Sequence, residues 1–248
     1  MGNRCGAAAC LRAFHIRKTA GPFDWIAFGA IEGRLNFILN DFANFLEIEN
    51  LKLSSVNKNA NFNVYFDEKF HFMFAHDFAA DMPLEKSFPL VKQKYNRRIE
   101  RFLNKLSDKN AKVLLFYIEE ENNEPLFDDT EKLKILCGRL CDKFNKVIDF
   151  VFVRQLPLGS VNTMSALWIS DNIIKYELHY DLDGRMPSNK EYRFYYKSVF
   201  KNIRLKLTKD MIISRLKRLI ILFVSNLVIN RKLKLKIRSL DKTTYEKF

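Results

Sequence analysis

The sequence predicts an α/β domain of mixed α+β type, followed by a basic extension. Two near-continuous apolar runs, 111–119 and 147–153, are typical of strands buried on both faces of a sheet. An amphipathic helical pattern over 130–146 separates them, and this order favours a parallel strand pair with a right-handed crossover. With 248 residues and 48% hydrophobic composition, the chain can bury a substantial core.

The segments before this unit predict helices first. Residues 5–14 are rich in Ala and lack β-branched residues, which favours a helix that begins at Cys5 and ends before Gly21. A longer helical pattern follows from about 31 to 45, and residues 50–62, rich in Asn, Ser and Lys, indicate a loop.

Strand patterns then alternate with one more helix. Aromatic residues at period two in 63–66 and 70–78 predict a pair of antiparallel strands. Residues 90–106 place their apolar side chains on one helical face. Two further segments, 173–182 and 192–200, are predicted as strands.

The net charge of +13 belongs mostly to the end of the chain. Residues 201–248 hold 14 Lys and Arg against 3 Asp and Glu, whereas residues 1–200 are nearly neutral. We therefore divide the chain into an α/β domain over 1–200 and a basic amphipathic helical extension over 201–248.

The extension combines its bases with an apolar stripe that includes Ile212, Leu216 and Phe223. Its uncharged stretch, 219–230, is shorter than the about 20 residues that span a bilayer. We expect contact with an anionic membrane surface, which places the protein in the cytoplasm, peripheral to the inner membrane. Nucleic acid is less expected because few aromatic residues lie among the bases, and a partner protein stays open as an alternative.

The four cysteines do not form a disulfide framework in a chain of this length, and the N-terminus lacks the layout of a secretory signal. Cys137 and Cys141, four apart on a predicted helix, are expected to pack in the core. His179, Asp181 and Asp183 share a strand face, but this segment is more simply a polar loop. We expect no metal, and no cofactor, because glycine-rich phosphate loops and dinucleotide fingerprints are missing.

The residues with the most reactive chemistry are Cys5, at a helix start, and His76-Asp77, at a strand end. A helix N-terminus lowers the pKa of a thiol, and its free N–H groups can stabilise an oxyanion. A histidine in contact would complete a thiolate–imidazolium pair. The alternative is a small buried cysteine and a structural histidine of the sheet.

A series of short motifs accompanies these residues: GNRC (2–5), LR (11–12), PFDWI (22–26), NDF (40–42), HDF (76–78) and RRIERF (97–102). Over roughly residues 1–155, this series resembles a bacterial family of papain-like cysteine peptidases of unknown function. The resemblance implies Cys5 as the nucleophile and His76 as the base. It leaves open whether Asp24, Asp77 or Asp149 is the third, orienting acid.

The resemblance also implies residues that bind substrate. Asn3 and the Cys5 backbone N–H are candidates for the oxyanion site, and Trp25 belongs to the specific PFDW motif. Three arginines of the RRIERF segment can bind phosphate or carboxylate, or can form a solvated helix face: Arg97, Arg98 and Arg101.

We therefore expect a thiol-dependent hydrolase or group transferase that acts on a peptide or glycan-linked substrate. Because members of the resembling family tend to accompany surface-glycan genes, the expected setting is bacterial surface-polysaccharide metabolism. The alternative is a non-catalytic binding module whose basic tail contacts anionic lipid, nucleic acid or a partner protein.

Overall fold

The computed structural model describes residues 1–202 except for 3, 15, 18, 58–60, 121–124, 157–162 and 180–187. Met1–Asn202 form one compact unit, and the predicted amphipathic extension lies outside the described residues. The elements are, in chain order, α1 (Gly6–Ala13), β1 (Ile26–Phe28), α2 (Ile31–Leu39), the short 3-10 helix η1 (Ile48–Asn50), β2 (Leu51–Asn57), β3 (Phe62–Asp67), β4 (Phe72–Ala79), α3 (Leu84–Ser107), β5 (Val113–Glu120), α4 (Pro125–Asp128), α5 (Thr130–Phe144), β6 (Ile148–Leu156), β7 (Thr163–Ser170), β8 (Ile173–His179) and α6 (Asn189–Asn202).

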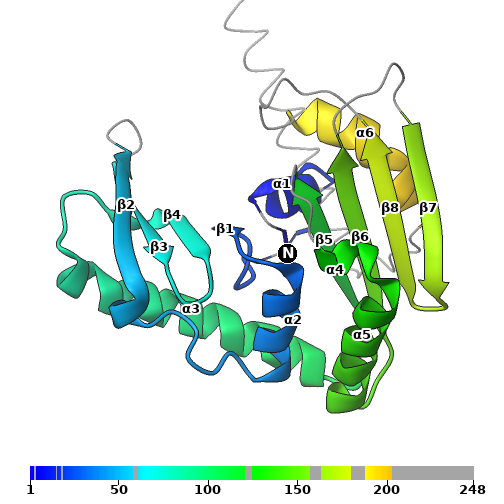
Figure 1. Ribbon diagram of the computed structural model, residues 1–248, viewed down its shortest axis with the longest axis horizontal. Coiled ribbons are helices and arrows are strands. Elements are labelled where there is room, and N and C mark those ends of the chain that lie inside the picture. Colours follow the sequence, from blue (N-terminus) through cyan, green and yellow to red (C-terminus); the bar gives the residue numbers. More distant parts are fainter. Residues whose placement is uncertain are drawn as a thin grey trace, which may run out of the picture. The chain divides into compact units, whose positions relative to one another are not determined.

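The later strands form a four-stranded sheet in the order β5-β6-β8-β7 (Figure 1). β5, β6 and β8 are parallel, and β7 joins the edge in antiparallel orientation. The predicted parallel pair with a helix between its strands is therefore confirmed. At the other edge, Gly2 forms a parallel bridge with Ile118 and the N-terminal amino group of Met1 donates to the carbonyl oxygen of Phe116, so these two residues run along β5.

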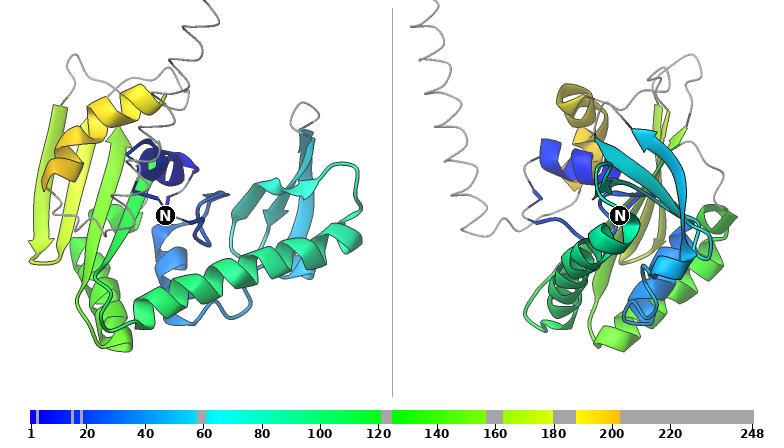
Figure 2. Two further views of the ribbon diagram at one scale, coloured as in Figure 1. Left: turned by 180° about the vertical axis from the view of Figure 1, so that it is seen from behind. Right: turned by 90° about the vertical axis from the view of Figure 1, so that its left-hand side faces the viewer.

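Helices cover both faces of this sheet. Phe116 of β5 contacts Tyr196 of α6, with the ring centroids 6.4 Å apart. Tyr117, which points to the opposite face, contacts Phe152, and Phe152 contacts Phe127 of α4. Figure 1 shows α4 and α5 in front of the sheet, and α6 is in front in the reverse view of Figure 2. Even-numbered residues of β5 thus lie on the α6 face and odd-numbered residues on the α4 face.

The earlier strands form an antiparallel sheet in the order β1-β4-β3-β2, which confirms the predicted pair β3 and β4. β2 runs through the segment 50–62 that the sequence indicated as a loop, so that prediction is wrong. Of the β2 residues only Leu51 is buried. An edge strand with a single buried side chain shows no hydrophobic alternation from which it could be predicted.

Helix α3 packs along the antiparallel sheet and begins six residues earlier than predicted. Val91, Tyr95 and Leu106 of its predicted apolar face are buried, as expected. Pro89 lies in the second turn, where it removes one helical hydrogen bond. The helix therefore tolerates this proline near its start, because the amphipathic face provides most of its stability.

Two further predictions are wrong in the C-terminal and N-terminal parts of the unit. The segment 192–200, expected as a strand, is part of α6, where Tyr192, Tyr196 and Val199 are buried at helical spacing. Helix α2 ends at Leu39 rather than near 45, because several residues of 41–46 adopt left-handed backbone conformations. The strands β1 and β7 and the short helix α4 had no counterpart among the predicted elements.

Candidate active site

Cys5 occupies the N-cap position of α1, as the sequence predicts. The first helical hydrogen bond runs from the N–H of Ala9 to the carbonyl oxygen of Cys5, at 3.0 Å. The N–H groups of the preceding turn therefore have no partner within the helix. Alanines fill the buried side of α1 and let it pack closely on β5 and α6. A half-buried thiol thus lies at a helix start whose first N–H groups have no partner within the helix.

The pKa of the Cys5 thiol is raised, whereas a helix N-terminus was expected to lower it. Burial, followed by the negative charges of Glu120, Asp77 and Asp24 in that order, raises the pKa of Cys5 to about 11. The predicted lowering by the helix N-terminus is therefore wrong for the resting protein. Cys5 is a neutral thiol at physiological pH, surrounded by carboxylates from three separate segments.

Asp24 and Asp77, the two favoured candidates for the third acid, are each engaged by basic or polar groups. Asp24 forms an ion pair with Arg17 at 2.8 Å and accepts a hydrogen bond from the N–H of Gly21. Asp77, whose side chain is 2% exposed, accepts from Tyr95 at 2.6 Å and pairs with Lys94 at 2.5 Å. Both carboxylates act on Cys5 through their charge.

His76 lies in an irregular part of β4. Tyr65 pairs with Phe74 and Asn63 with Phe78, so three residues of β4, His76 among them, lie opposite a single residue of β3. Such bulges redirect side chains and are over-represented next to active sites. His76 is exposed, and among the described residues it forms no hydrogen bond with Cys5, Asp24 or Asp77.

Trp25 brings the PFDW and HDF motifs into contact. Its ring meets that of His76 edge to face, with centroids 5.9 Å apart. The guanidinium groups of Arg17 and Arg12 lie 5.3 and 6.0 Å from the centre of the Trp25 ring. The LR, PFDW and HDF motifs thus form one contiguous cluster, whose acids reach Cys5 electrostatically.

Asp149, the remaining candidate for the third acid, lies elsewhere. It is paired with Leu114 at the N-terminal ends of β6 and β5, whereas Glu120, near Cys5, pairs with Gln155 at the other end. Six residues of extended strand separate the two positions, about 20 Å. Asp149 is therefore excluded as an orienting acid of this cluster.

The other residues predicted to bind substrate are Asn3 and three arginines of α3, and the arginines differ in their surroundings. Asn3 lies outside the described residues. Arg98 is half-buried, with its guanidinium 5.0 Å from the centre of the Tyr95 ring, and thus supports the residue that holds Asp77. Arg97 and Arg101 are exposed on α3.

Comparison with known proteins identifies the family of this chain. Residues 1–153 match the family described as "Putative papain-like cysteine peptidase (DUF1796)". The chain belongs to this family. No match was found among curated proteins or among solved structures. The predicted resemblance over roughly residues 1–155 is confirmed, and the matched region contains the whole cluster around Cys5 and His76.

One residue of this papain-like cluster was missed by the sequence analysis. Glu120, at the end of β5, is 5% exposed and lies on the α6 face, beside the start of α1. The available signal was a pair of acids, Glu119 and Glu120, ending a strand that is otherwise buried and apolar. Only the packing of α1 on β5 identifies which of the two adjoins Cys5.

Other groups considered for chemistry stay apart from this site. Cys137 is buried in the core and Cys141 contacts the carbonyl oxygen of Ile148, at the far end of the sheet. His179 is described, but Asp181 and Asp183 lie outside the described residues. Within residues 1–202, so far as they are described, no group of three or more His, Cys, Asp or Glu side chains could hold a metal ion. No helix in that same part of the chain is long and apolar enough to cross a membrane.

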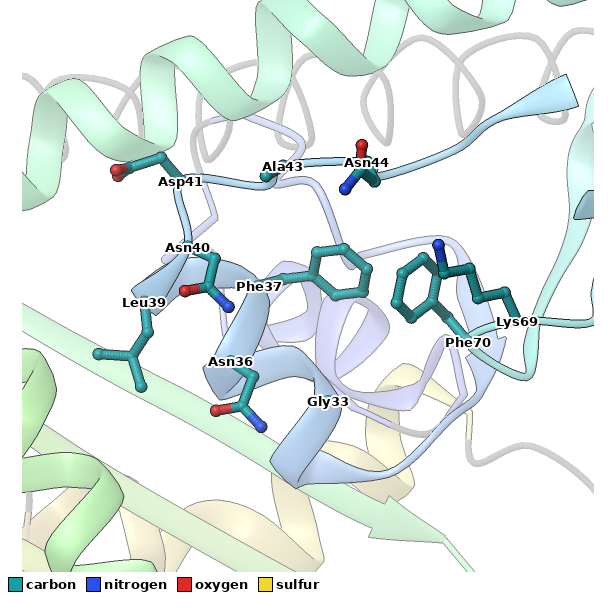
Figure 3. A pocket seen from close by; sticks show the side chains of 10 residues that line it. All are labelled: Gly33, Asn36, Phe37, Leu39, Asn40, Asp41, Ala43, Asn44, Lys69 and Phe70. Atoms are coloured by element: carbon teal, nitrogen blue, oxygen red, sulfur yellow. The ribbon is translucent and has the colours of Figure 1, made fainter.

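A hollow of about 770 Å³ lies at the end of α2, between the following loop and the turn before β4 (Figure 3). Phe37 and Phe70 lie next to each other at its centre, with ring centroids 4.5 Å apart. Asn40 and Asp41 of the NDF motif line it, whereas Phe42 of the same motif stacks on Phe23 of the PFDW motif, with ring centroids 5.2 Å apart. Four strand residues, or roughly 13 Å, separate Phe72, at the start of β4, from His76.

Proposed function

We propose that this protein is a thiol-dependent hydrolase or group transferase of papain-like type, with Cys5 as nucleophile and His76 as general base. One observation carries the proposal. Two acids from the PFDW and HDF motifs, Asp24 and Asp77, act electrostatically on the thiol at the start of α1. Segments far apart in the sequence therefore converge on a single cysteine.

The raised pKa of Cys5 favours a general-base mechanism over a resting thiolate–imidazolium pair. As the Cys5 sulfur bonds to the carbonyl carbon of the substrate, its proton moves to His76. The carbonyl oxygen becomes an oxyanion beside the free N–H groups of α1. His76 then protonates the leaving group as its bond to the carbonyl carbon breaks, which leaves a thioester on Cys5.

The second half of the reaction releases the acyl group. Water attacks the thioester while His76 takes one of its protons, and the proton returns to the Cys5 sulfur as the carbon–sulfur bond breaks. If another hydroxyl or amine attacks in place of water, the same steps give group transfer. A hydrolase and a transferase thus differ here only in the acceptor.

The neighbours of His76 have positioning roles in this proposal. Trp25 packs edge to face against the imidazole and restricts its rotation. Asp77 is bound to α3 through Tyr95 and Lys94, so it fixes the backbone next to His76 rather than bonding its ring. Closure of the gap between His76 and Cys5 belongs to the substrate complex, because catalytic hydrogen bonds often form only there.

Hydrolysis of p-nitrophenyl acetate, a generic acyl substrate, tests the role of Cys5. We expect Cys5→Ala to fold and to lose hydrolysis to the background rate. Cys10→Ala is the matched control, because Cys10 lies on the same helix and is fully buried, and it should retain hydrolysis. Equal rates in wild type and Cys5→Ala would refute the nucleophile.

A non-catalytic binding module is the second candidate, favoured by the neutral state of the Cys5 thiol. It predicts that all these variants lack hydrolysis.

In either case we propose that the extension after residue 202 contacts an anionic membrane surface. For the enzyme, we propose that the substrate is a peptide or glycan-linked group of surface-polysaccharide metabolism. Co-sedimentation with anionic vesicles should be lost when the chain is truncated after Asn202, and equal sedimentation of both chains would refute the membrane contact.

A further inference from the structure

We propose that Glu120 is a positioning residue of the Cys5 site: its carboxylate lies against the first turn of α1 and controls how readily the Cys5 thiol gives up its proton. This inference deepens the proposed function, on which it rests for the role of Cys5. Its basis is the geometry at the junction of β5, α1 and α6.

The alternation of β5 separates Glu120 from its neighbour. Glu119 lies on the α4 face, where it accepts a hydrogen bond from Arg154 at 3.0 Å. Arg154 in turn forms an ion pair with Asp128 at 2.7 Å. Glu120 points to the α6 face, toward α1. Two adjacent buried carboxylates thus have separate environments, and only Glu120 is among the charges that act on Cys5.

Gly6, the first residue of α1, makes room for this carboxylate. A Cβ atom on Gly6 would overlap the Oε1 atom of Glu120 and would lie 3.1 Å from the hydroxyl oxygen of Tyr192. Glycine permits such close approach to a helix backbone because it has no side chain. The carboxylate therefore occupies the space directly beside the residue that follows Cys5.

The charge of Glu120 acts on both thiols of α1. Apart from burial, it is the largest cause of the raised pKa of Cys5, and it also raises that of Cys10. A carboxylate at a helix N-terminus is itself stabilised by the dipole and the free N–H groups. Glu120 thus competes with a Cys5 thiolate for the same positive potential.

The two other acids that act on Cys5 form ion pairs with basic residues. Asp24 is paired with Arg17 and Asp77 with Lys94. From α6, Tyr192 lies closest to the Gly6 position. Removal of the Glu120 charge alone should therefore ease thiolate formation without rearranging those pairs.

The experiment measures the rate at which iodoacetamide alkylates Cys5 as a function of pH, in a Cys10→Ala background. Trypsin releases Cys5 and position 10 on one peptide, 5–12, so this background makes the assignment by mass spectrometry unambiguous. We expect Glu120→Gln to shift the alkylation profile to lower pH and to raise the rate at pH 8 by about tenfold, the size expected from one nearby charge.

Two further variants make the result specific. Glu120→Asp keeps the charge and should leave the profile close to that of wild type. Glu119→Gln makes the same substitution one residue away, on the α4 face, and should also leave it unchanged. Circular dichroism verifies that each variant is folded. If Glu120→Gln unfolds, Glu120→Asp still provides a test. The proposal requires that a shorter side chain with the same charge does not shift the alkylation profile.

The proposal is overturned if Glu120→Gln folds without a shift, if Glu120→Asp shifts the profile as much as Glu120→Gln does, or if Glu119→Gln gives an equal shift. None of these readings depends on turnover. If Cys5→Ala retained acyl hydrolysis, the proposed function would fail, while the effect of Glu120 on the Cys5 thiol would still be measured by alkylation.

Discussion

Asp77 connects the histidine strand to the long helix α3. Its carboxylate is almost fully buried, accepts a hydrogen bond from Tyr95 and forms an ion pair with Lys94. A buried carboxylate is stable only when its oxygens are satisfied. The hydroxyl of Tyr95 therefore holds Asp77, the residue next to His76, in place. Burial and the charge of Asp77 raise the pKa of Tyr95 well above its usual value, so the hydroxyl stays a donor.

We predict that Tyr95→Phe lowers the free energy of unfolding by about 1.5–3 kcal/mol, the range for hydrogen bonds to charged groups. Urea denaturation measures the change. Tyr65→Phe is the matched control: Tyr65 is also a buried tyrosine, and its hydroxyl makes no hydrogen bond to a described residue. A Tyr95→Phe change no larger than that of Tyr65→Phe would contradict the role assigned to this bond.

Residue motifs predicted part of the site and could not predict the rest. Cys5 at a helix start and His76 on a strand follow from local patterns, whereas the contact of Trp25 with His76 is seen only in the folded chain. The direction of the pKa shift of Cys5 could not be predicted, because it depends on burial and on Glu120, which meets α1 only in the folded chain. The dipole of α1 by itself would lower this pKa, but burial and the nearby acids outweigh it.

At the scale of elements, the glycines in the helices differ in how much space surrounds them. Gly33 lies in the first turn of α2, and a Cβ atom there would meet nothing within 4 Å. Gly138 in α5 is equally open. Glycine within a helix costs roughly 0.5–1 kcal/mol relative to alanine. Neither residue is required by packing within the described part of the unit.

We therefore predict that Gly33→Ala and Gly138→Ala each raise the free energy of unfolding by about 0.5–1 kcal/mol. Gly6→Ala should lower it, because the added methyl group would displace the Glu120 carboxylate. Thermal denaturation of the three variants gives the comparison. Stabilisation by Gly6→Ala, or destabilisation by Gly33→Ala, would contradict the packing described for these helices.

Elements were predictable where hydrophobic periodicity was strong. The buried strands β5 and β6 and the helix between them were predicted nearly to their ends. The segment that forms α6 is rich in aromatic residues, which favour strands locally, yet packing against Phe116 and Phe14 makes it helical. Tertiary contacts of this kind override local preference and are not visible in a short window of sequence.

At the scale of the whole molecule, several buried groups keep their protons to higher pH than they do in an unfolded chain. The pKa of Cys5 is raised to about 11, and those of Cys10, Cys137 and Tyr95 are also raised. In the unfolded chain a cysteine titrates near about 8.5. Above that pH the unfolded state loses protons first, so the free energy of unfolding decreases as pH rises.

We predict that the stability contributed by these raised pKa values is fully present below about pH 8.5 and is lost progressively toward pH 11. Because Cys5 is only partly buried, its own share is discounted to about 1–2 kcal/mol. Chemical denaturation at a series of pH values measures it, with Cys5→Ala beside wild type. Cys5→Ala should lose less stability over this interval, and parallel curves for the two proteins would show that Cys5 does not titrate as described.

The compact unit through Asn202 also sets the limit for any truncation. Helix α6 ends at Asn202, so the predicted domain boundary at residue 200 would remove its last two residues. A chain that ends at Asn202 keeps the whole helix, including Phe200, which packs against Phe14 at 4.4 Å between ring centroids.

The central claim is that His76 acts as the base for Cys5. The most direct measurement is the rate at which p-nitrophenyl acetate acetylates Cys5 at neutral pH, followed by intact-protein and peptide mass spectrometry in wild type and His76→Ala. The proposed mechanism predicts acetyl-Cys5 in wild type and a rate at least about 10²-fold lower in His76→Ala, as expected for loss of a general base. Equal acetylation of Cys5 in both proteins, or acetylation of other residues only, would contradict it.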